Sequence, residues 1–220
     1  QVVVNTSIYN ESIFNSALTA MKDAFKAGLC VSDLVAVAGA GQKLGDVVVP
    51  QGKVGLATLC SITINGVLLK SGIPMDSRFG GVLQLRHGRP LRFVDLIEYS
   101  GSSLDPSEAY IRAGMTNVRD AALTGNGSIL ANFREVPAPS RQLVEDTIGK
   151  LKTWGINGAL FIGNPSEPVC QMPVGFNRAG IVLLGGLNPV AAAEEAGIKA
   201  DNIAMAGMMD FSRLSSFWKL

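Results

Sequence analysis

The sequence contains an internal repeat. At an offset of 125 residues, the segment from Val35 to Ile73 aligns without a gap on the segment from Leu160 to Ile198. Each segment has the order strand, loop, strand, sharp turn, helix and terminal glycine, and such self-similarity indicates a repeated structural unit. Five aligned pairs are identical: Val49/Val174, Gly55/Gly180, Leu59/Leu184, Gly72/Gly197 and Ile73/Ile198. Any two α/β stretches can align loosely, but the shared order of elements favours duplication.

A second offset extends the repeat toward the N-terminus. At 127 residues, Val2–Asn5 falls on Ile129–Asn132, and the helical pattern of Ser12–Leu29 falls on Pro139–Ile156. We therefore predict an α/β fold, with a mixed α+β arrangement as the alternative, in one domain over 1–220. Two copies of a strand–helix–strand–strand–helix unit, at 1–73 and 128–198, would be related by a pseudo-two-fold axis. The segment 74–127 would be an insertion, and 199–220 a C-terminal segment.

Local patterns support this order of elements. Asp105, Pro106 and Glu108 predict a helix start, because they place an N-cap, a proline at the first helical position and an acidic residue in the first turn. The helix expected over Pro139–Thr153 would direct Leu143, Ile148 and Leu151 inward. Two strands, over 80–85 and 91–97, would be joined by a turn at 87–90.

Composition excludes several classes of protein. Apolar residues make up 47% of the 220 residues, charged residues 17%, and the net charge is +1. This predicts a sizeable core, and it argues against a nucleic-acid-binding face, which needs clustered Lys and Arg. No apolar stretch reaches the roughly 18 residues of a membrane span, and no signal peptide is visible. The chain opens with Gln1 directly before a strand pattern, which suggests a piece of a longer protein.

The cysteines indicate a reducing compartment. Cys30, Cys60 and Cys170 are odd in number and have no CxxC spacing, which favours free thiols in the cytoplasm over disulfides or a zinc site. The sequence has no spaced cluster of His, Cys and carboxylate residues that could ligate a metal ion. We predict no metal and no cofactor.

The repeat places two similar turns at helix starts. Cys60–Thr63 follows the strand of the first copy, and Gly185–Asn188 follows the equivalent strand of the second. Free backbone N–H groups at a helix N-terminus attract anions, and small residues such as Ser61, Gly185 and Gly186 permit close approach. Thr63 and Asn188 occupy equivalent positions and are predicted N-caps. Two such turns could hold the two carboxylates of a dicarboxylate, or they could be ordinary helix caps.

Other polar residues have two interpretations. Arg78, in a loop before a strand, and Arg134, at the end of a buried strand, could each clamp a carboxylate through the two-pronged guanidinium. Arg134 could instead pair with Glu135 or Asp105, and this structural role is slightly favoured. Ser102 lies in a loop before a helix, either as part of a capped loop or as a wall of a site.

Catalytic patterns are poor. The single histidine, His87, falls in a turn, and no GxSxG, GxxxxGK[ST] or HExxH motif occurs. Gly39-Ala40-Gly41 matches a dinucleotide fingerprint only faintly. Cys60 could be a nucleophile at a helix N-terminus, but no base is evident. We therefore predict no catalytic residue.

Several motifs resemble one family. The segments are 58–66 (TLCSITING), 72–74 (GIP), 78–81 (RFGG), 99–106 (YSGSSLDP), 133–137 (FREVP) and 185–189 (GGLNP). Together they resemble the effector domain of the NrpR nitrogen-regulation repressors of methanogenic archaea, and the likeness covers nearly the whole chain. The resemblance draws attention to Thr58 and implies that Cys60 lies in a motif associated with effector response. It also implies that an N-terminal winged helix-turn-helix, absent from this sequence, accompanies such domains.

The resemblance implies a function. It predicts a domain that binds 2-oxoglutarate as an inducer and lowers operator affinity of a repressor of nitrogen-fixation and nitrogen-assimilation genes. Operator DNA would be contacted only through the missing domain, and the partner would be a second copy in a homodimer or higher homo-oligomer. Phe211, Phe217 and Trp218 are candidates for an exposed apolar surface. The alternatives are a small-molecule enzyme with Cys60 as nucleophile and a purely structural dimerisation domain.

Overall fold

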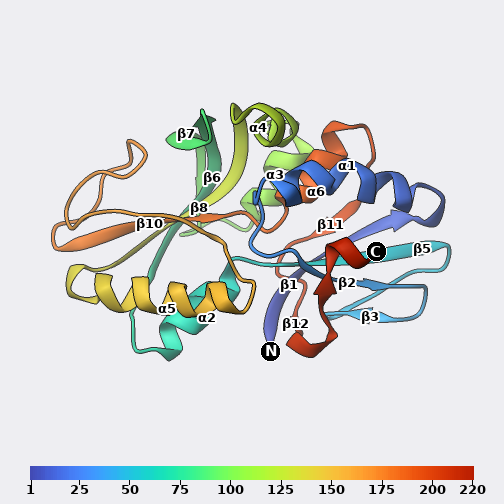
Figure 1. The fold of residues 1–220 in the computed structure, drawn as a ribbon, viewed down its shortest axis with the longest axis horizontal. Helices are drawn as coiled ribbons and strands as arrows, with labels where there is room; N and C mark the ends of the chain where they lie inside the picture. Colours follow the sequence, from blue (N-terminus) through green and yellow to red (C-terminus); the bar gives the residue numbers. More distant parts are fainter.

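A computed structural model describes all 220 residues (Figure 1). The six α-helices are α1 (Phe14–Lys26), α2 (Ile62–Lys70), α3 (Pro106–Arg112), α4 (Val118–Thr124), α5 (Arg141–Thr153) and α6 (Asn188–Glu195). The longer strands are β1 (Val2–Asn10), β2 (Leu34–Ala38), β5 (Lys53–Leu59), β6 (Asp76–Arg86), β7 (Arg89–Glu98), β8 (Gly127–Pro137), β9 (Ala159–Ile162) and β10 (Arg178–Leu184). The short strands are β3 (Lys43–Leu44), β4 (Val47–Val48), β11 (Asp201–Ile203), β12 (Met208–Met209) and β13 (Ser215–Ser216).

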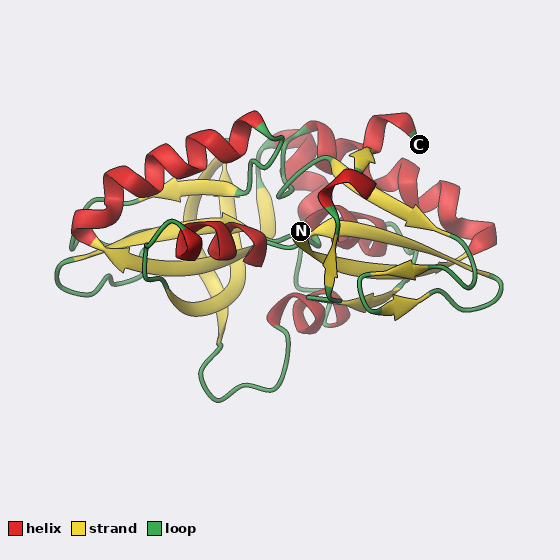
Figure 2. Cartoon of the chain, turned by 90° about the horizontal axis from the view of Figure 1, so that it is seen from below, coloured by secondary structure: helices red, strands yellow, loops and turns green.

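The longer strands form two antiparallel sheets. The first has the order β11-β1-β5-β2-β13, with β12 also paired to β1, and the second has the order β7-β6-β8-β10-β9. Figure 2 shows the two sheets as neighbouring lobes of one elongated molecule. None of the helices has the length and apolar character that a membrane span requires.

The two sheets share one register. β1 pairs with β5 in the first sheet, and β8 pairs with β10 in the second. At the repeat offsets of 127 and 125 residues, the paired residues of the first sheet align with paired residues of the second. The matching pairs are Val4–Leu59 with Ala131–Leu184, and Ser7–Leu56 with Arg134–Ile181. The predicted fold class, a mixed α/β arrangement with a duplicated unit, is therefore confirmed.

The two copies exchange their last elements. β6 begins at Asp76, which is 125 residues before Asp201, the first residue of β11. β6 follows the first copy but pairs with β8 of the second, and β11 follows the second copy but pairs with β1 of the first. The helices cross over in the same way, since α2 packs against α5 and α6 packs against α1 (Figure 1). The correspondence thus continues into the segment that the sequence pattern assigned to an insertion.

Most predicted elements are present, with several corrections. Asp105 caps α3 and accepts a hydrogen bond from the Glu108 N–H at 3.0 Å. In α5, Ile148 and Leu151 are buried as predicted, but Leu143 is 45% exposed and Val144 takes its place on the buried face. The turn between β6 and β7 needs only two residues, 87 and 88.

The C-terminal aromatic residues are only partly a surface. Phe217 is 3% exposed and stacks on Phe25 with ring centroids 4.1 Å apart, so its prediction as an exposed residue is wrong. Trp218 is 52% exposed. Phe211 is half-buried and makes an edge contact with Trp154. The C-terminal segment therefore closes the first lobe rather than presenting a continuous apolar patch.

Candidate functional site

A small cavity lies where the two repeated turns meet. Its volume is about 110 Å³, which is below the roughly 300–1,000 Å³ of common ligand pockets, so it would admit only a small molecule. Both turns and both copies contribute to its walls. The lining residues are Asn5, Cys60, Ser61, Ile62, Ser77, Tyr99, Asp105, Ser107, Asn132, Arg134, Gly186, Leu187, Ala204 and Met205.

Arg134 brings an unpaired positive charge to this cavity. The residue is 3% exposed, and its Nη1 atom is buried without a hydrogen-bond partner. Its guanidinium carbon lies 4.8 Å from the centre of the Tyr99 ring, and its Nε donates to Asn65 Oδ1 at 3.4 Å. Because burying an uncompensated charge is costly, such a group favours an anionic partner.

The carboxylates near Arg134 do not neutralise it. Glu135 is engaged by Arg78 at 3.4 Å and by Arg178 at 3.7 Å, so the predicted pairing of Arg134 with Glu135 is wrong. No salt bridge joins Arg134 to Asp105 either. Asp105 lines the same cavity, but no Asp or Glu forms a salt bridge with Arg134, which favours the alternative in which Arg134 clamps a ligand carboxylate.

Two equivalent asparagines flank the cavity. Asn5 and Asn132 correspond at the offset of 127, and of the two only Asn132 bonds to one of the turns. Asn132 Nδ2 donates to Ser61 Oγ at 3.0 Å, and its Oδ1 accepts from the Tyr99 hydroxyl. Asn5 Oδ1 accepts from the Met205 N–H at 3.2 Å. The pair holds the walls of the cavity on both sides of the pseudo-two-fold axis.

Gly186 sets how closely the turns approach. A Cβ atom at this position would lie 2.2 Å from the Leu59 carbonyl oxygen and 2.5 Å from Asn5 Nδ2. The equivalent residue of the first copy is Ser61, whose hydroxyl is buried beside the cavity. The two turns are thus in contact, and only one of them offers a hydroxyl.

Thr63 and Asn188 have a different role from the predicted one. Neither side chain caps its own helix. Thr63 Oγ1 accepts from the Val3 N–H at 2.9 Å and donates to the Val3 carbonyl at 3.1 Å. Asn188 makes the same pair of bonds to Leu130, at 2.8 and 3.0 Å. Val3 and Leu130 correspond in the repeat. Thr63 and Asn188 therefore have equivalent roles, since each ties a helix to the first strand of a copy.

The remaining predicted residues lie around or outside the cavity. Thr58 is buried and its Oγ1 accepts from Asn5 Nδ2 at 3.4 Å, while Gly185 packs against Leu130. Arg78 is half-exposed and pairs with Glu135. Ser102 is exposed and bonds only within its own loop. The structure therefore brings together four of the predicted residues, Cys60, Ser61, Arg134 and Gly186.

Six polar residues of the cavity were not among the predicted ligand-binding residues: Asn5, Ser77, Tyr99, Asp105, Ser107 and Asn132. Asn5 and Asn132 carried a detectable signal, since they are identical residues at matching positions of the two copies. Tyr99 and Asp105 lie in the segment between the copies, which the repeat could not relate to either turn. Only the fold brings that segment back over the cavity.

Burial dominates the electrostatics of the cavity. Burial raises the pKa of the Cys60 thiol, although the Ile62 N–H partly offsets the effect. Burial likewise raises the pKa of Tyr99 and of the Asp105 carboxyl. A raised thiol pKa disfavours the thiolate, which is the reactive form in nucleophilic catalysis.

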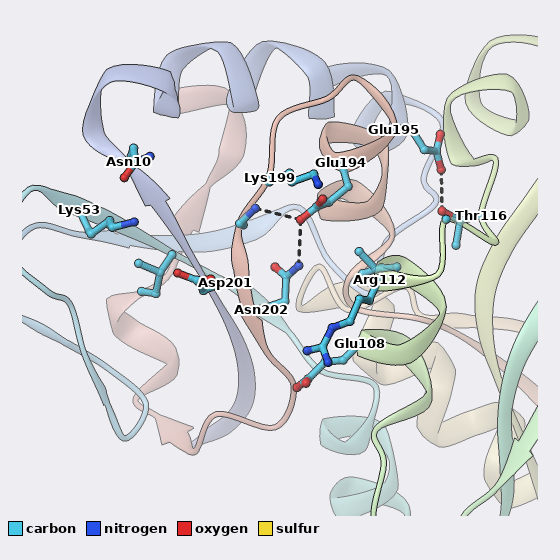
Figure 3. Close-up of a pocket in the computed structure, with 14 residues that line it drawn as sticks. Asn10, Lys53, Glu108, Arg112, Thr116, Glu194, Glu195, Lys199, Asp201 and Asn202 are labelled. Atoms are coloured by element: carbon cyan, nitrogen blue, oxygen red, sulfur yellow. Dashed lines mark hydrogen bonds between the residues drawn. The ribbon is translucent and has the colours of Figure 1, made fainter.

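A larger cavity of about 650 Å³ lies between β1, α3 and α6 (Figure 3). Its carboxylates satisfy backbone groups. Glu195 accepts from the Val118 and Arg119 N–H groups at the start of α4, and Glu194 accepts from Ala200 N–H. The charged ends of its cations, labelled in Figure 3, lie apart from one another: Lys53, Arg112 and Lys199. These groups brace the fold and do not converge on one ligand. No cluster of three or more His, Cys, Asp and Glu is placed to hold a metal ion.

Comparison with known proteins identifies the family. The model for NrpR regulatory domains NRD1 and 2 matches residues 1–216. The chain belongs to the NrpR regulatory-domain family. The global nitrogen regulator NrpRI of Methanosarcina mazei is 32% identical over 213 residues, which are 97% of this chain and 65% of that protein. The global nitrogen regulator NrpR of Methanocaldococcus jannaschii is 32% identical, over 98% of this chain and 36% of that protein.

A solved structure agrees with this NrpR assignment. A nitrogen repressor-like protein from Methanococcus jannaschii superposes with a TM-score of 0.80 and 29% identity, over 98% of this chain and 88% of that chain. The NrpR regulatory domain described here spans less than two thirds of the length of the curated relatives. It is thus a regulatory domain of a nitrogen repressor family, and the predicted resemblance is confirmed.

Proposed function

We propose that this domain senses 2-oxoglutarate in the cavity between the two turns. In the longer repressor the ligand would act as an inducer that lowers operator affinity. The observation that carries the proposal is the buried guanidinium of Arg134, which faces the cavity without a carboxylate partner. A dicarboxylate would supply the missing negative charge.

The cavity also offers a place for a second carboxylate. Ser61 and Ile62 form the entry to α2, a helix of nine residues, and the positive end of a helix dipole favours anions. The equivalent turn of the second copy contributes Gly186, which has no hydroxyl. We therefore expect one 2-oxoglutarate per domain in a single orientation, with Arg134 at one end and the start of α2 at the other.

The position of the cavity suggests how binding would be transmitted. Its walls come from both copies, so a bound ligand would favour one arrangement of the copies over another. To relieve repression, the ligand must bind the conformation with low operator affinity more tightly, because equal affinity for two states shifts no population. We further propose that the domain acts as a homodimer, since symmetric repressors read two half-sites.

Thermal unfolding in the presence of 2-oxoglutarate tests the proposal. A ligand at 100 times its dissociation constant adds about 2.7 kcal/mol to the stability of the native state, which corresponds to roughly 5–11 °C for a domain of this size. Succinate and glutamate are the controls for charge and length. A rise in melting temperature that is specific to 2-oxoglutarate supports sensing. Identical unfolding curves with and without the ligand would instead support a purely structural dimerisation domain.

Cys60→Tyr probes the location of the site. The added ring would fill a cavity of about 110 Å³, so the response to 2-oxoglutarate should disappear while the circular-dichroism spectrum stays unchanged. Cys170→Ser is the matched control, because Cys170 lies outside the cavity lining. Normal binding by a folded Cys60→Tyr protein would place the ligand elsewhere.

A further inference from the structure

The β6–β7 hairpin carries an unneutralised row of arginines. Arg86, Arg89 and Arg92 are all exposed, and none takes part in the five salt bridges of the chain. Arg86 and Arg89 lie directly opposite each other across the two strands, and Arg92 lies opposite Gln84. Cross-strand partners share a face, and Gln84 is two residues from Arg86. A register shift between Gln84 and Leu85 leaves one extra residue on β7, so Arg89 and Arg92, although three residues apart, lie on the same face as Arg86.

The arrangement is unfavourable without an anion. Like charges directly opposite each other across an antiparallel pair destabilise it. The net charge of the chain is only +1, so this row is a local concentration and not a reflection of general basicity. The first lobe has no counterpart, since its equivalent strand β11 ends after three residues. The row therefore belongs to one end of the molecule.

A polar groove runs beside the row of arginines. It has a volume of about 630 Å³ and no carboxylate in its lining, which includes Arg86, Arg92, Asn117, Asn126 and Ser128. Arg92 Nε donates to Gln84 Oε1 at 3.1 Å, which orients its guanidinium. Arginine, asparagine and serine side chains are the groups that contact nucleic-acid phosphates.

The hairpin is held rigidly. His87 and Gly88 form a two-residue turn with φ values of 51° and 73°, as a type I′ turn requires. The turn is tied to the loop before β8, because His87 N–H donates to Asn126 Oδ1 at 3.0 Å and Gly88 N–H donates to the Gly125 carbonyl at 2.8 Å. Figure 1 shows this hairpin rising beside α4. A fixed platform limits the ordering cost of binding.

We propose that this arginine face contacts the phosphate backbone of DNA. The contact would be independent of sequence and would add to whatever segment of the repressor reads the operator. An extended row of guanidinium groups beside hydroxyl and amide donors suits a linear polyanion better than a compact metabolite. The proposal rests on membership of a repressor family and not on 2-oxoglutarate sensing. It differs from the expectation, based on total charge, that no face of this domain meets DNA.

Fluorescence anisotropy with a labelled DNA duplex of arbitrary sequence tests this proposal on the chain as it stands. Three phosphate contacts predict that the logarithm of the binding constant falls with the logarithm of salt concentration with a slope of about −2.7. The combined variant Arg86→Gln, Arg89→Gln, Arg92→Gln should weaken binding at least about tenfold and bring the slope close to zero. A melting temperature equal to that of the wild type would show that this variant is folded.

The combined variant Lys22→Gln, Lys150→Gln, Lys152→Gln is the matched control, because it removes the same charge from exposed helix positions outside the groove. It should retain both affinity and slope. Equal loss in both variants, or no binding by the wild type at low salt, would overturn the proposal. Competition with polyglutamate at equal charge concentration distinguishes DNA from an acidic protein as the partner of this face. If polyglutamate displaces the labelled duplex as well as unlabelled duplex does, the face is a dock for acidic proteins and the DNA proposal is wrong.

Discussion

The two copies share a backbone more closely than a sequence. Three positions of the first copy have a positive φ and are glycines, and the three equivalent positions of the second copy also have a positive φ but carry side chains. The pairs are Gly41 and Ser166, Gly45 and Cys170, and Gly52 and Asn177. A left-handed conformation costs an L-residue roughly 1–2 kcal/mol, so the second copy keeps a geometry that its residues disfavour. The fold therefore determines the loop conformation in both copies.

The copies differ far more in charge. In the second lobe, Glu135 pairs with Arg78 and Arg178, and Asp76 lies within 3.9 Å of the same arginines. The equivalent positions of the first lobe are Ile8, Ile203, Lys53 and Asp201, which form no salt bridge. Arg134 is equivalent to Ser7, and both have a buried polar atom without a partner. The two lobes thus share a frame, and the charges of the candidate site lie in only one of them.

The contact between the turns gives the largest expected effect. Gly186→Ser introduces the residue of the first copy into the second, and its Cβ would meet the Leu59 carbonyl oxygen at 2.2 Å. Because the obstructing atoms belong to the backbone of a buried strand, we expect a loss of about 3 kcal/mol or more in the free energy of unfolding. Chemical denaturation measures it. A cost below about 1 kcal/mol would mean that the turns are not pressed together.

The next effect concerns Arg134 and Ser7. Arg134→Met should remove the stabilisation by saturating 2-oxoglutarate, about 2.7 kcal/mol at 100 times the dissociation constant. The unliganded protein should be as stable as the wild type or more stable, because an unpaired buried charge is removed. Ser7→Ala is the control on the other side of the axis and should keep the full response. Calorimetric titration of both variants decides, and a full response in Arg134→Met would refute the assignment.

Exchange of residues at the left-handed positions should have a smaller effect. Gly45→Cys places a side chain at φ 60° and 2.4 Å from the Ala206 carbonyl oxygen, and we expect a loss of about 2 kcal/mol. Gly52→Asn should stay within about 0.5 kcal/mol, since asparagine tolerates this conformation and no atom lies within 4 Å. Urea denaturation compares the two. Equal losses in the free energy of unfolding for Gly45→Cys and Gly52→Asn would show that the loops of the two copies are not equivalent.

The smallest expected effect concerns Asp105, which has no counterpart in the first copy. Burial raises its folded pKa above the value of about 3.9 in an unfolded chain. Its favourable contribution is present below that value and is lost as the pH rises through the folded pKa. Asp105→Asn keeps a cap on α3 but has no such loss. The variant should therefore gain stability relative to the wild type between pH 4 and pH 7, and a constant difference would contradict the burial argument.

The sequence predicted the repeat and four of the fourteen residues that line the cavity. Periodicity and matching glycines located the strands and the two turns, and Cys60, Ser61, Arg134 and Gly186 do line one cavity. The exchange of β6 and β11 could not be predicted, because hydrophobic patterns define which face of a strand is buried but not which sheet it joins. The strands β11, β12 and β13 have only two or three residues each, too few for any pattern to be recognised.

The hydrogen-bond and ion-pair partners of individual side chains could not be predicted from the sequence either. Thr63 and Asn188 have the composition of N-caps, yet their bonds go to Val3 and Leu130, which are distant in the chain. Arg134 is followed directly by Glu135, and adjacent residues in a strand point to opposite faces, so the pair cannot meet across the sheet. Tyr99 enters the cavity only because β7 returns beside β6.

The exchange of terminal strands has a consequence for biogenesis. Within this domain β1 is synthesised nearly 200 residues before its neighbour β11, so Thr6 cannot pair until Ile203 has been made. Pairings so remote in the chain slow folding, since a long loop must close before any contact forms. Until then the open side of β1 is an unprotected edge on which other nascent chains could pair. We expect this domain to fold only once β11 has been synthesised, in one late cooperative step and not copy by copy.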